Sequence, residues 1–484
     1  MAELAATFRR SALDGYFKFA ENGTTLGRDT MAGVTTFIVM SYIIFLNPAI
    51  LGLGGDGLPL PGALTSTCLV AGVMTIIMGV YTNRAYAIAP GLGINAIVAF
   101  SLVLGAGLGF PEAMGIIVME GALVTILVLV GMREKIMRAI PLELKKAIAI
   151  GIGLFIAFIG LFDSGLVVQG QGIPVTLVRF TTWPVLVTLF GLAVTLGLRA
   201  RGFRGDLLVG IVATTILATL INWGTDYKAF TAPGVARWPS DIVNSPDFSL
   251  VGNISFDSFA TLGVVATLAW IFSLFLADFF DTMGTLVGVG KQAGYLTKDG
   301  ELPEIRKPLL VDSVAAMAGG AASASSATTY IESGAGVGAG GRTGWVAVVC
   351  GALFFPFMFF APVIGMVPLQ ATAPALIIVG YLMMTALSEA EERAEPGQDG
   401  VAERKLAGID FSDLALGFSA AITILVMPFT YSITNGIGFG FISYVVIRLA
   451  QGEWRRVHPL LYAVAGGFVL YFLVPLLQDH LSWV

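Results

Sequence analysis

Long apolar segments recur along the whole chain and alternate with short polar connections. A helix needs about 20 mostly apolar residues to cross a bilayer, so these segments predict an all-α polytopic membrane protein. Before the polar stretch 224–258 the apolar windows are 30–51, 63–80, 85–105, 112–131, 144–162, 182–198 and 205–223. After that stretch they are 259–287, 309–323, 328–341, 343–362, 371–388, 411–428, 432–449 and 457–478.

The C-terminal windows allow two topologies, because one window is left over from a division into two sets of seven. Either 457–478 is an added crossing, or 411–428 and 432–449 are short helices that do not each span the bilayer. The side of the membrane that holds the C-terminus depends on this choice, and both alternatives stay open.

Lys and Arg residues gather in alternate connections, which is the pattern of loops that face the cytoplasm. They occur in the N-terminal arm 1–29 and in every second connection after it, whereas the other short loops contain almost none apart from Arg179. The N-terminus is therefore predicted to be cytoplasmic, and 224–258 to be an extracytoplasmic loop. This loop separates a first half, 30–223, from a second half, 259–484.

Composition excludes several classes of protein. Hydrophobic residues make up 56% of the chain and charged residues 12%, against roughly 25% charged in a typical soluble domain. Too little polar surface remains for a soluble enzyme or a secreted disulfide scaffold. The net charge is −5 with no dense basic block, so no nucleic-acid partner is expected. Cys68 and Cys350 lie in apolar segments and are predicted to be core residues; no metal site and no cofactor are expected.

The two halves echo one another at a nearly fixed offset. Gly-Ala-Leu at 121–123 recurs at 351–353, 230 residues later, and Pro-Leu at 141–142 recurs at 368–369, 227 residues later. An odd number of crossings in each half gives the two copies opposite orientations in the membrane. The pattern predicts two inverted seven-helix repeats, the usual architecture of secondary transporters.

One window in each half is interrupted at a corresponding place. The third contains Pro90 and Gly91, and the tenth contains 328–333 followed by a glycine-rich run at 334–341. These residues predict broken third and tenth helices whose free amide groups face a cavity near the middle of the membrane, where transporters bind their substrates. The alternative is that the glycines only permit close helix packing.

Three acidic residues are singled out as lying well inside apolar windows of the second half: Asp278, Asp281 and Glu332. An acidic side chain at that depth costs roughly 2.5–3.5 kcal/mol, and Asp278 and Asp281 share one helical face. Such a carboxyl serves a ligand or a proton, or it only holds broken backbone by accepting amide hydrogen bonds. Glu120 also has apolar neighbours. Asn95, in the third window, either binds the edge of a ligand's ring or caps the half-helix.

These segments resemble the signature segments of a known family. The residues 89–96, 278–282, 328–333, 340–344 and 435–440 are similar to those of the azaguanine-type (AzgA-like) purine permeases in the nucleobase/ascorbate transporter superfamily. The resemblance covers nearly the whole chain. It implies about fourteen helices in two inverted repeats, with core helices 1–4 and 8–11 moving against gate helices 5–7 and 12–14. It also implies proton-coupled, elevator-type import of adenine, guanine or hypoxanthine across the cell membrane, and a homodimer through the gate domains.

On this resemblance, the expected substrate contacts are polar or aromatic residues at the two interruptions and on the acidic helix. They are Asp278, Glu332, Asn95, Tyr330, Thr329, and Phe279 or Phe280. Glu332 and Asp278 are the expected main ligands of the base. Their carboxylates would accept hydrogen bonds from the ring N–H groups of the base. Asp281 is the expected proton carrier, although the two aspartates can exchange these roles.

Other classes of protein stay open on the sequence alone. A transporter of the same fold could carry another nucleobase or a small anion, although an inorganic anion would want fixed positive charge and three acids disfavour that. An intramembrane aspartyl protease needs aspartates on two helices, whereas Asp278 and Asp281 share one. A channel is also open. The sequence does not specify the preferred purine, the number of protons or the oligomeric state.

Overall fold

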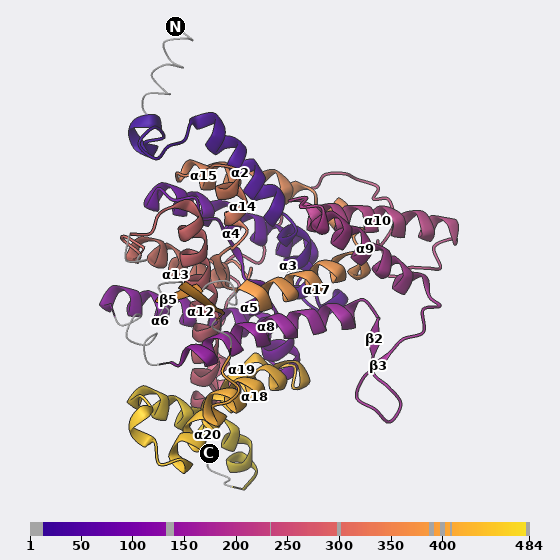
Figure 1. The fold of residues 1–484 in the computed structure, drawn as a ribbon. Coiled ribbons are helices and arrows are strands. Elements are labelled where there is room, and N and C mark those ends of the chain that lie inside the picture. The colour runs from indigo at the N-terminus through magenta and orange to yellow at the C-terminus, as the bar shows by residue number, and fades with distance from the viewer. Residues whose placement is uncertain are drawn as a thin grey trace. The chain divides into compact units, whose positions relative to one another are not determined.

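The described part of the structure is mostly helical (Figure 1). The computed structural model describes residues 13–131, 140–232, 234–297, 302–386, 392–396, 402–406 and 409–480, so residues 1–12 of the predicted N-terminal arm lie outside it. Contacts divide the chain into two compact units. Unit 1 consists of Met1–Gly91, Gly160–Asn253 and Thr285–Ala375, and unit 2 consists of Leu92–Ile159, Ile254–Gly284 and Leu376–Val484.

Unit 1 combines helices from both halves of the chain. In it α4 packs along α13 and α15, α15 also packs against α2, and α9 pairs with α10. The buried thiol of Cys350 contacts the sulfur of Met40 at 3.5 Å, and Cys68 is buried as well, so both cysteines are core residues as predicted. The helices of unit 1 are α2 (Leu26–Met40), α3 (Ile43–Leu51), α4 (Leu60–Thr82), α9 (Trp183–Ala200), α10 (Asp206–Gly224), α13 (Arg306–Ala321), α14 (Ser333–Gly338), α15 (Trp345–Phe354) and α16 (Ala361–Gly365).

Unit 2 is held together partly by an aromatic cluster around Tyr431. The ring of Tyr431, in the turn between α18 and α19, meets the rings of Phe100, Phe155 and Phe158 at centroid distances of 5.5, 5.3 and 5.8 Å. The helices of unit 2 are α5 (Leu92–Ala96) with a π-helical continuation (Ile97–Gly105), α6 (Phe110–Val130), α11 (Ser258–Leu262), α18 (Leu414–Phe429), α19 (Ile433–Ala450) and α20 (Pro459–His480). Three helices contain a point of division between the units: α8 (Leu142–Asp163), α12 (Val264–Ala293) and α17 (Leu369–Ala386).

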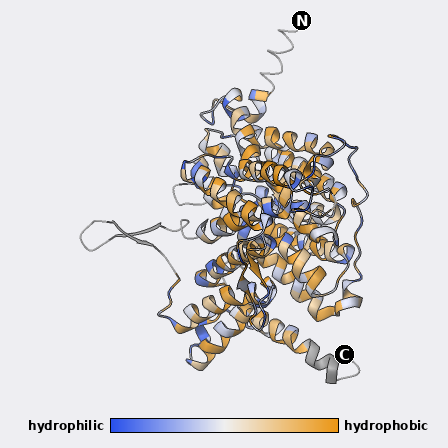
Figure 2. Ribbon diagram, turned by 90° about the vertical axis from the view of Figure 1, so that its right-hand side faces the viewer, coloured by the Kyte–Doolittle hydropathy of each residue, from blue (hydrophilic) through white to orange (hydrophobic). Residues whose placement is uncertain are grey.

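The helices have the composition of membrane spans. Eight helices among the described residues are long and apolar enough to cross a membrane, and five shorter apolar helices accompany them. Figure 2 shows hydrophobic residues along most of the helical turns. On α10 the usual pattern of a soluble helix is reversed, because apolar side chains are exposed (Val209, Val212, Ile216 and Leu220) and polar ones are buried (Thr214, Thr215, Thr219 and Asn222). The prediction of a helical multi-pass membrane protein is confirmed.

The fold is all-helical as predicted, and three pairs of short strands accompany the helices of the described residues. Among the described residues β1 (Ile88–Pro90) pairs with β4 (Ala327–Thr329), β2 (Val167–Val168) with β3 (Thr176–Leu177), and β5 (Glu392–Pro396) with β6 (Ala402–Leu406), all antiparallel. The sequence predicted only broken helices at β1 and β4. A break leaves backbone groups without intrahelical partners, and at membrane depth a second extended segment can supply those partners.

The C-terminal helices differ in length. Helix α18 has 16 residues and α19 has 18, whereas α20 has 22. At 1.5 Å per residue α18 is about 24 Å long, which is shorter than the hydrocarbon core of about 30 Å. By length and composition α19 is among the eight helices able to cross a membrane, whereas α18 and the segment Pro459–Leu473 of α20 are among the shorter apolar helices, so neither alternative for the C-terminal windows is selected.

Helices α4 and α15 cross at glycines in unit 1. A Cβ atom added at Gly79 would lie 2.3 Å from the carbonyl oxygen of Gly344, and one added at Gly344 would lie 1.9 Å from the oxygen of Gly79. Seven residues away on each helix, Gly72 and Gly351 approach in the same way, since a Cβ at Gly351 would lie 2.6 Å from the oxygen of Gly72. The two antiparallel backbones are therefore in direct contact, as in other membrane helix pairs that use small residues.

A second glycine crossing, in unit 2, joins corresponding positions of the two halves. A Cβ atom at Gly153 of α8 would lie 2.5 Å from the oxygen of Gly380 of α17, and one at Gly380 would lie 2.4 Å from the oxygen of Gly153. Gly153 and Gly380 are separated by the same 227 residues that separate Pro141 from Pro368. Equivalent positions of the proposed duplication therefore touch each other.

We expect the substitution Gly79→Val to destabilise the protein by about 1–3 kcal/mol, the usual cost of forcing extra atoms into a packed core, because the neighbouring atom is backbone and cannot rotate away. The measurement is the thermal unfolding of the detergent-solubilised protein. Gly197→Val in α9 is the matched control, since nothing lies within 4 Å of a Cβ at that position. Equal losses in the two variants would contradict the close crossing.

Candidate functional site

The centre of unit 1 is the antiparallel pairing of β1 with β4. Ile88 lies opposite Thr329 and Pro90 lies opposite Ala327, and all residues of both strands are buried. The hydroxyl of Thr75 on α4 closes the outer edge of β1, because it donates to the carbonyl oxygen of Ile88 and accepts from the N–H of Ile88, both at 2.8 Å. The broken third and tenth segments thus satisfy each other's backbone.

Asp312 of α13 closes the outer edge of β4. Its Oδ1 atom accepts from the backbone N–H of Thr329 at 2.8 Å and from the hydroxyl of Thr329 at 2.7 Å, and the carboxyl is fully buried. A charged acceptor with two short hydrogen bonds offsets much of the cost of burying it. Asp312 therefore holds broken backbone by accepting amide hydrogen bonds, the role that stayed open for Asp278, Asp281 and Glu332. The hydroxyl hydrogen of Thr329 is already used in its bond to Asp312.

Tyr330 ties the segment after β4 to β1. Its backbone N–H donates to the carbonyl oxygen of Ala87 at 2.9 Å, and its buried hydroxyl donates to the carbonyl oxygen of Pro90. Ser333 adds a second tie, since its hydroxyl accepts from the N–H of Ala87 at 2.9 Å and donates to the carbonyl of Tyr330 at 2.6 Å. Both side chains hold the backbone in a fixed course just before and after Glu332.

Glu332 occupies the N-cap position of α14, but its carboxyl is not used as a cap. Its Oε1 atom accepts a hydrogen bond from the hydroxyl of Tyr42 at 2.6 Å, and α14 has no side-chain hydrogen bond at its cap. Tyr42 is 1% exposed and lies at the interruption between α2 and α3, whereas Glu332 is half-buried. The carboxyl is therefore held in one place by a neutral donor and keeps acceptor sites for other hydrogen bonds.

The other end of α14 is fixed by Arg342 and Asp29. The guanidinium of Arg342 donates to the carbonyl oxygens of Val337 and Gly341, both at 2.7 Å. The buried carboxyl of Asp29 accepts from the N–H groups of Arg342 and Thr343 at 3.2 and 3.0 Å. Because both ends are held, the position of Glu332 does not depend on α14 alone, which is a helix of only six residues.

In unit 2, Asn95 is a fully buried side chain within α5. Neither its amide nitrogen nor its oxygen has a hydrogen-bond partner among the described residues. A buried unsatisfied amide costs free energy, so such a group is expected where a ligand or water completes its hydrogen bonds. The alternative role as a helix cap is not what the structure shows, because Asn95 lies inside α5 and makes no capping bond.

The acidic helix α12 contributes Asp278 and Asp281 to unit 2. Asp278 is fully buried and Asp281 is half-buried. Phe279 is 1% exposed, and its ring lies 5.5 Å from the ring of Phe275. Glu120 of α6 is fully buried as well. The side chain of Phe280 lies outside what the structure describes.

The structure brings together some of the predicted site residues within unit 1. Unit 1 holds Glu332, Tyr330 and Thr329 around the strand pair, and unit 2 holds the remainder. Among the described residues no group of three or more His, Cys, Asp or Glu side chains could hold a metal ion. The predicted residues of unit 2 are Asn95, Asp278, Phe279 and Asp281.

Four residues that build the site of unit 1 were missed by the sequence analysis: Asp29, Tyr42, Thr75 and Asp312. Asp312 lies inside the window 309–323, so the criterion of acidic residues at membrane depth could have found it. Asp29 directly precedes the first window and was counted with the polar arm. Nothing in the sequence marks Tyr42 or Thr75, because a Tyr or Thr in an apolar window is ordinary.

Broken membrane helices, a strand pair that satisfies them and a positioned carboxyl are the features of a multi-pass membrane transporter. A family model described as a permease family matches residues 27–394. The adenine permease AdeQ of Escherichia coli is 36% identical over 458 residues, which cover 95% of this chain and 95% of AdeQ. The guanine/hypoxanthine permease PbuO of Bacillus subtilis is 36% identical over 461 residues, which cover 94% of this chain and 99% of PbuO.

The solved structures agree at the level of the fold. The transmembrane domain of a cyanobacterial bicarbonate transporter, BicA, superimposes with a TM-score of 0.59 at 14% identity, over 85% of this chain and 97% of that domain. The chain belongs to the permease family, in the azaguanine-type group that its motifs resemble. It is a transporter and not an enzyme, which removes the intramembrane protease from the alternatives.

We expect Asp312→Ala to lower the stability of the protein by about 1–3 kcal/mol, the cost of leaving the buried N–H of Thr329 without its acceptor. Thermal unfolding in detergent measures the loss. Asp56→Ala is the control, because Asp56 is exposed on a loop and such surface changes stay within about 0.5 kcal/mol. If both variants unfold at the temperature of the unsubstituted protein, Asp312 does not support β4.

Proposed function

We propose that this permease imports purine nucleobases by proton symport with alternating access. The observation that carries the proposal is the carboxyl of Glu332, which Tyr42 positions at a helix break without using it as a cap. The substrate class follows the relatives, whose names specify adenine and guanine/hypoxanthine. The proposed location is the cell membrane, with the N-terminus in the cytoplasm as the distribution of Lys and Arg predicts.

A purine suits a carboxyl of this kind. The base is a flat, neutral ring with N–H donors and nitrogen or oxygen acceptors on its edges. A carboxylate accepts hydrogen bonds only, so Glu332 would bind ring N–H groups. The bond from Tyr42 occupies one side of Oε1 and leaves the other carboxyl oxygen for the base. An inorganic anion, the alternative substrate, would bring its negative charge close to the negative charge of the Glu332 carboxylate.

The remaining site residues receive proposed roles one by one. Asp278 is the second ligand of the base and Asp281 the proton carrier, or the two exchange these roles. Asn95 would hydrogen-bond an edge of the ring, which agrees with its buried and unsatisfied amide. Phe279 would contact the face of the ring. Thr329 and Tyr330 have donated their hydroxyl hydrogens within unit 1, so they would contribute as acceptors or through the backbone.

Proton coupling follows from the physical chemistry of a carboxyl in a membrane. Loss of hydration disfavours its charged form, so a proton and a base that both interact with the carboxyl depend on each other. A carboxyl that binds both is a usual element of proton relays in transporters. After the base and the proton have been released on one side of the membrane, the site must open to the other side to bind the next ones, which is alternating access.

For the architecture we propose about fourteen helices in two inverted repeats, 30–223 and 259–484. The matching interruptions and the contact between the equivalent residues Gly153 and Gly380 support this duplication. Core helices 1–4 and 8–11 would move against gate helices 5–7 and 12–14 in an elevator-type cycle. A homodimer through the gate helices is part of the proposal.

We expect saturable uptake of labelled adenine, guanine or hypoxanthine, but not of uracil, in cells that lack their own nucleobase permeases and express this chain. A protonophore should abolish accumulation, and Glu332→Gln should reduce uptake at least tenfold because a neutral amide cannot exchange the proton. Glu304→Gln is the control, since Glu304 is an exposed loop residue paired with Lys307 at 2.8 Å. No purine uptake by well-expressed protein would contradict the substrate class.

The Tyr42→Phe variant tests the positioning of Glu332. A hydrogen bond to a charged group contributes about 1.5–3 kcal/mol, so its loss should raise KM for the base about tenfold with little change in protein level. The control is Tyr16→Phe, which removes an exposed hydroxyl that donates to the carbonyl of Val80 at 2.6 Å. Unchanged uptake kinetics in Tyr42→Phe would show that Glu332 needs no positioning by this hydroxyl.

A further inference from the structure

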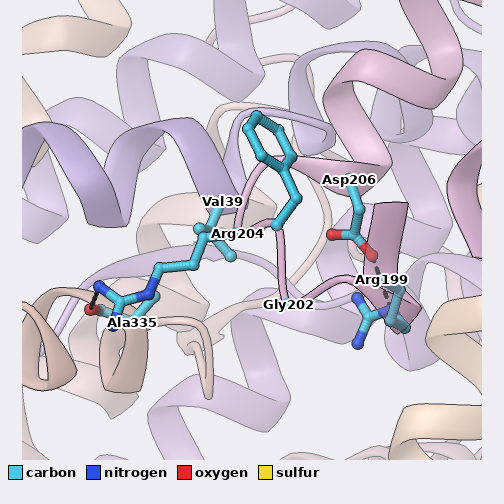
Figure 3. A pocket seen from close by; sticks show the side chains of 7 residues that line it. Val39, Arg199, Gly202, Arg204, Asp206 and Ala335 are labelled. Carbon is cyan, nitrogen blue, oxygen red and sulfur yellow. Dashed lines mark hydrogen bonds and ion pairs between the residues drawn. The ribbon is translucent and has the colours of Figure 1, made fainter. Parts of the chain in front are cut away.

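A pocket of about 250 Å³ lies at the turn between α9 and α10 in unit 1. Figure 3 shows that it is bounded by this turn, by the end of α2 and by α14, the helix that begins directly after Glu332. None of the residues predicted or found around the strand pair lines it. The lining residues are Val39, Arg199, Gly202, Phe203, Arg204, Asp206 and Ala335.

The pocket has an excess of positive charge. The Nε atom of Arg199 forms an ion pair with Oδ2 of Asp206 at 2.6 Å, and Asp206 is 4% exposed. Arg204 donates from Nη1 to the carbonyl oxygen of Ala335 at 3.5 Å, which is long for a hydrogen bond. Within the described part of the chain, the other N–H groups of both guanidiniums have no protein acceptor. Two cations and one carboxylate therefore surround a space with several unused donors.

The chemistry of these donors selects a phosphate group. A guanidinium presents its N–H groups in a planar fork that matches the oxygens of a phosphate. A pocket of about 250 Å³ has room for one such group.

The surroundings of the pocket indicate where the phosphate comes from. Phe203, which lines it, is 51% exposed, and Leu196 on α9 and Ile38 on α2 are 47% and 40% exposed. The pocket lies at the ends of two helices of membrane-spanning length, α9 and α10, where lipid headgroups are found. A free phosphate ion would gain nothing from these apolar side chains, whereas the acyl chains of a lipid would cover them.

We propose that this pocket binds the phosphate group of an anionic membrane phospholipid. The phosphate accepts hydrogen bonds from Arg199 and Arg204, and the acyl chains lie along Phe203 and Leu196. Because Arg204 also contacts α14 through Ala335, the bound lipid stabilises the contact between the α9–α10 turn and α14. Basic pockets between membrane helices are a general means of recognising anionic headgroups.

The test measures lipid binding and thermal unfolding of the purified full-length protein in detergent with added phosphatidylglycerol or phosphatidylcholine of identical acyl chains. Phosphatidylglycerol should remain bound and raise the unfolding temperature. Arg204→Gln, a change of an exposed side chain, should weaken this binding roughly tenfold, as expected for the loss of charge-assisted hydrogen bonds. Arg201→Gln, in the same turn but outside the pocket lining, is the control and should bind like the unsubstituted protein.

Three results would overturn the proposal. Equal stabilisation by phosphatidylcholine would mean that only the apolar flanks bind lipid. Equal weakening by Arg201→Gln and Arg204→Gln would mean that the charge of the turn acts without a defined pocket. Stabilisation by inorganic phosphate but not by phosphatidylglycerol would assign the site to the free ion. None of these measurements uses a nucleobase, so they are independent of the proposed transport function.

Discussion

The site of unit 1 depends on one constraint: at membrane depth, every backbone N–H and C=O group that leaves a helix must find another partner. The third and tenth segments both leave the helical conformation, at β1 and at β4. They satisfy the constraint by pairing with each other, and each outer edge is closed by one side chain, Thr75 for β1 and Asp312 for β4. Without these partners the breaks would cost several kcal/mol for each unsatisfied group.

Because the breaks are satisfied in this way, the acidic residues of unit 1 divide into two kinds. Asp29 and Asp312 are fully buried, and each accepts hydrogen bonds from the hydroxyl and the backbone N–H of one Thr residue, so both carboxyl groups serve the fold. Glu332 is half-buried, its carboxyl accepts a hydrogen bond from the hydroxyl of Tyr42, and it makes no side-chain hydrogen bond that caps α14. The difference lies in the partners and not in the residue type.

The sequence allowed the prediction of membrane spans and of the two interruptions, because apolar length and the positions of Pro and Gly are local properties. It did not allow the prediction of the strand pair, since the pairing of Ile88 with Thr329 joins residues more than 200 positions apart. It identified Glu332 as an unusual residue but could not distinguish it from Asp312, because only the three-dimensional partners separate a structural carboxyl from an available one. The sequence also did not allow the prediction that α10 exposes its apolar face and buries its polar one, because that depends on which helices pack against α10.

The pairing of β1 with β4 also has a consequence for how the protein is made. A chain is synthesised and inserted into the membrane from its N-terminus, so β1 enters the bilayer long before β4 exists. During that interval Thr75 can satisfy Ile88, but the remaining edge of β1 has no strand to pair with. The edge of β1 therefore stays without its partner strand until the tenth segment has been made, so the strand pair at the centre of unit 1 forms only after more than half of the chain has been synthesised.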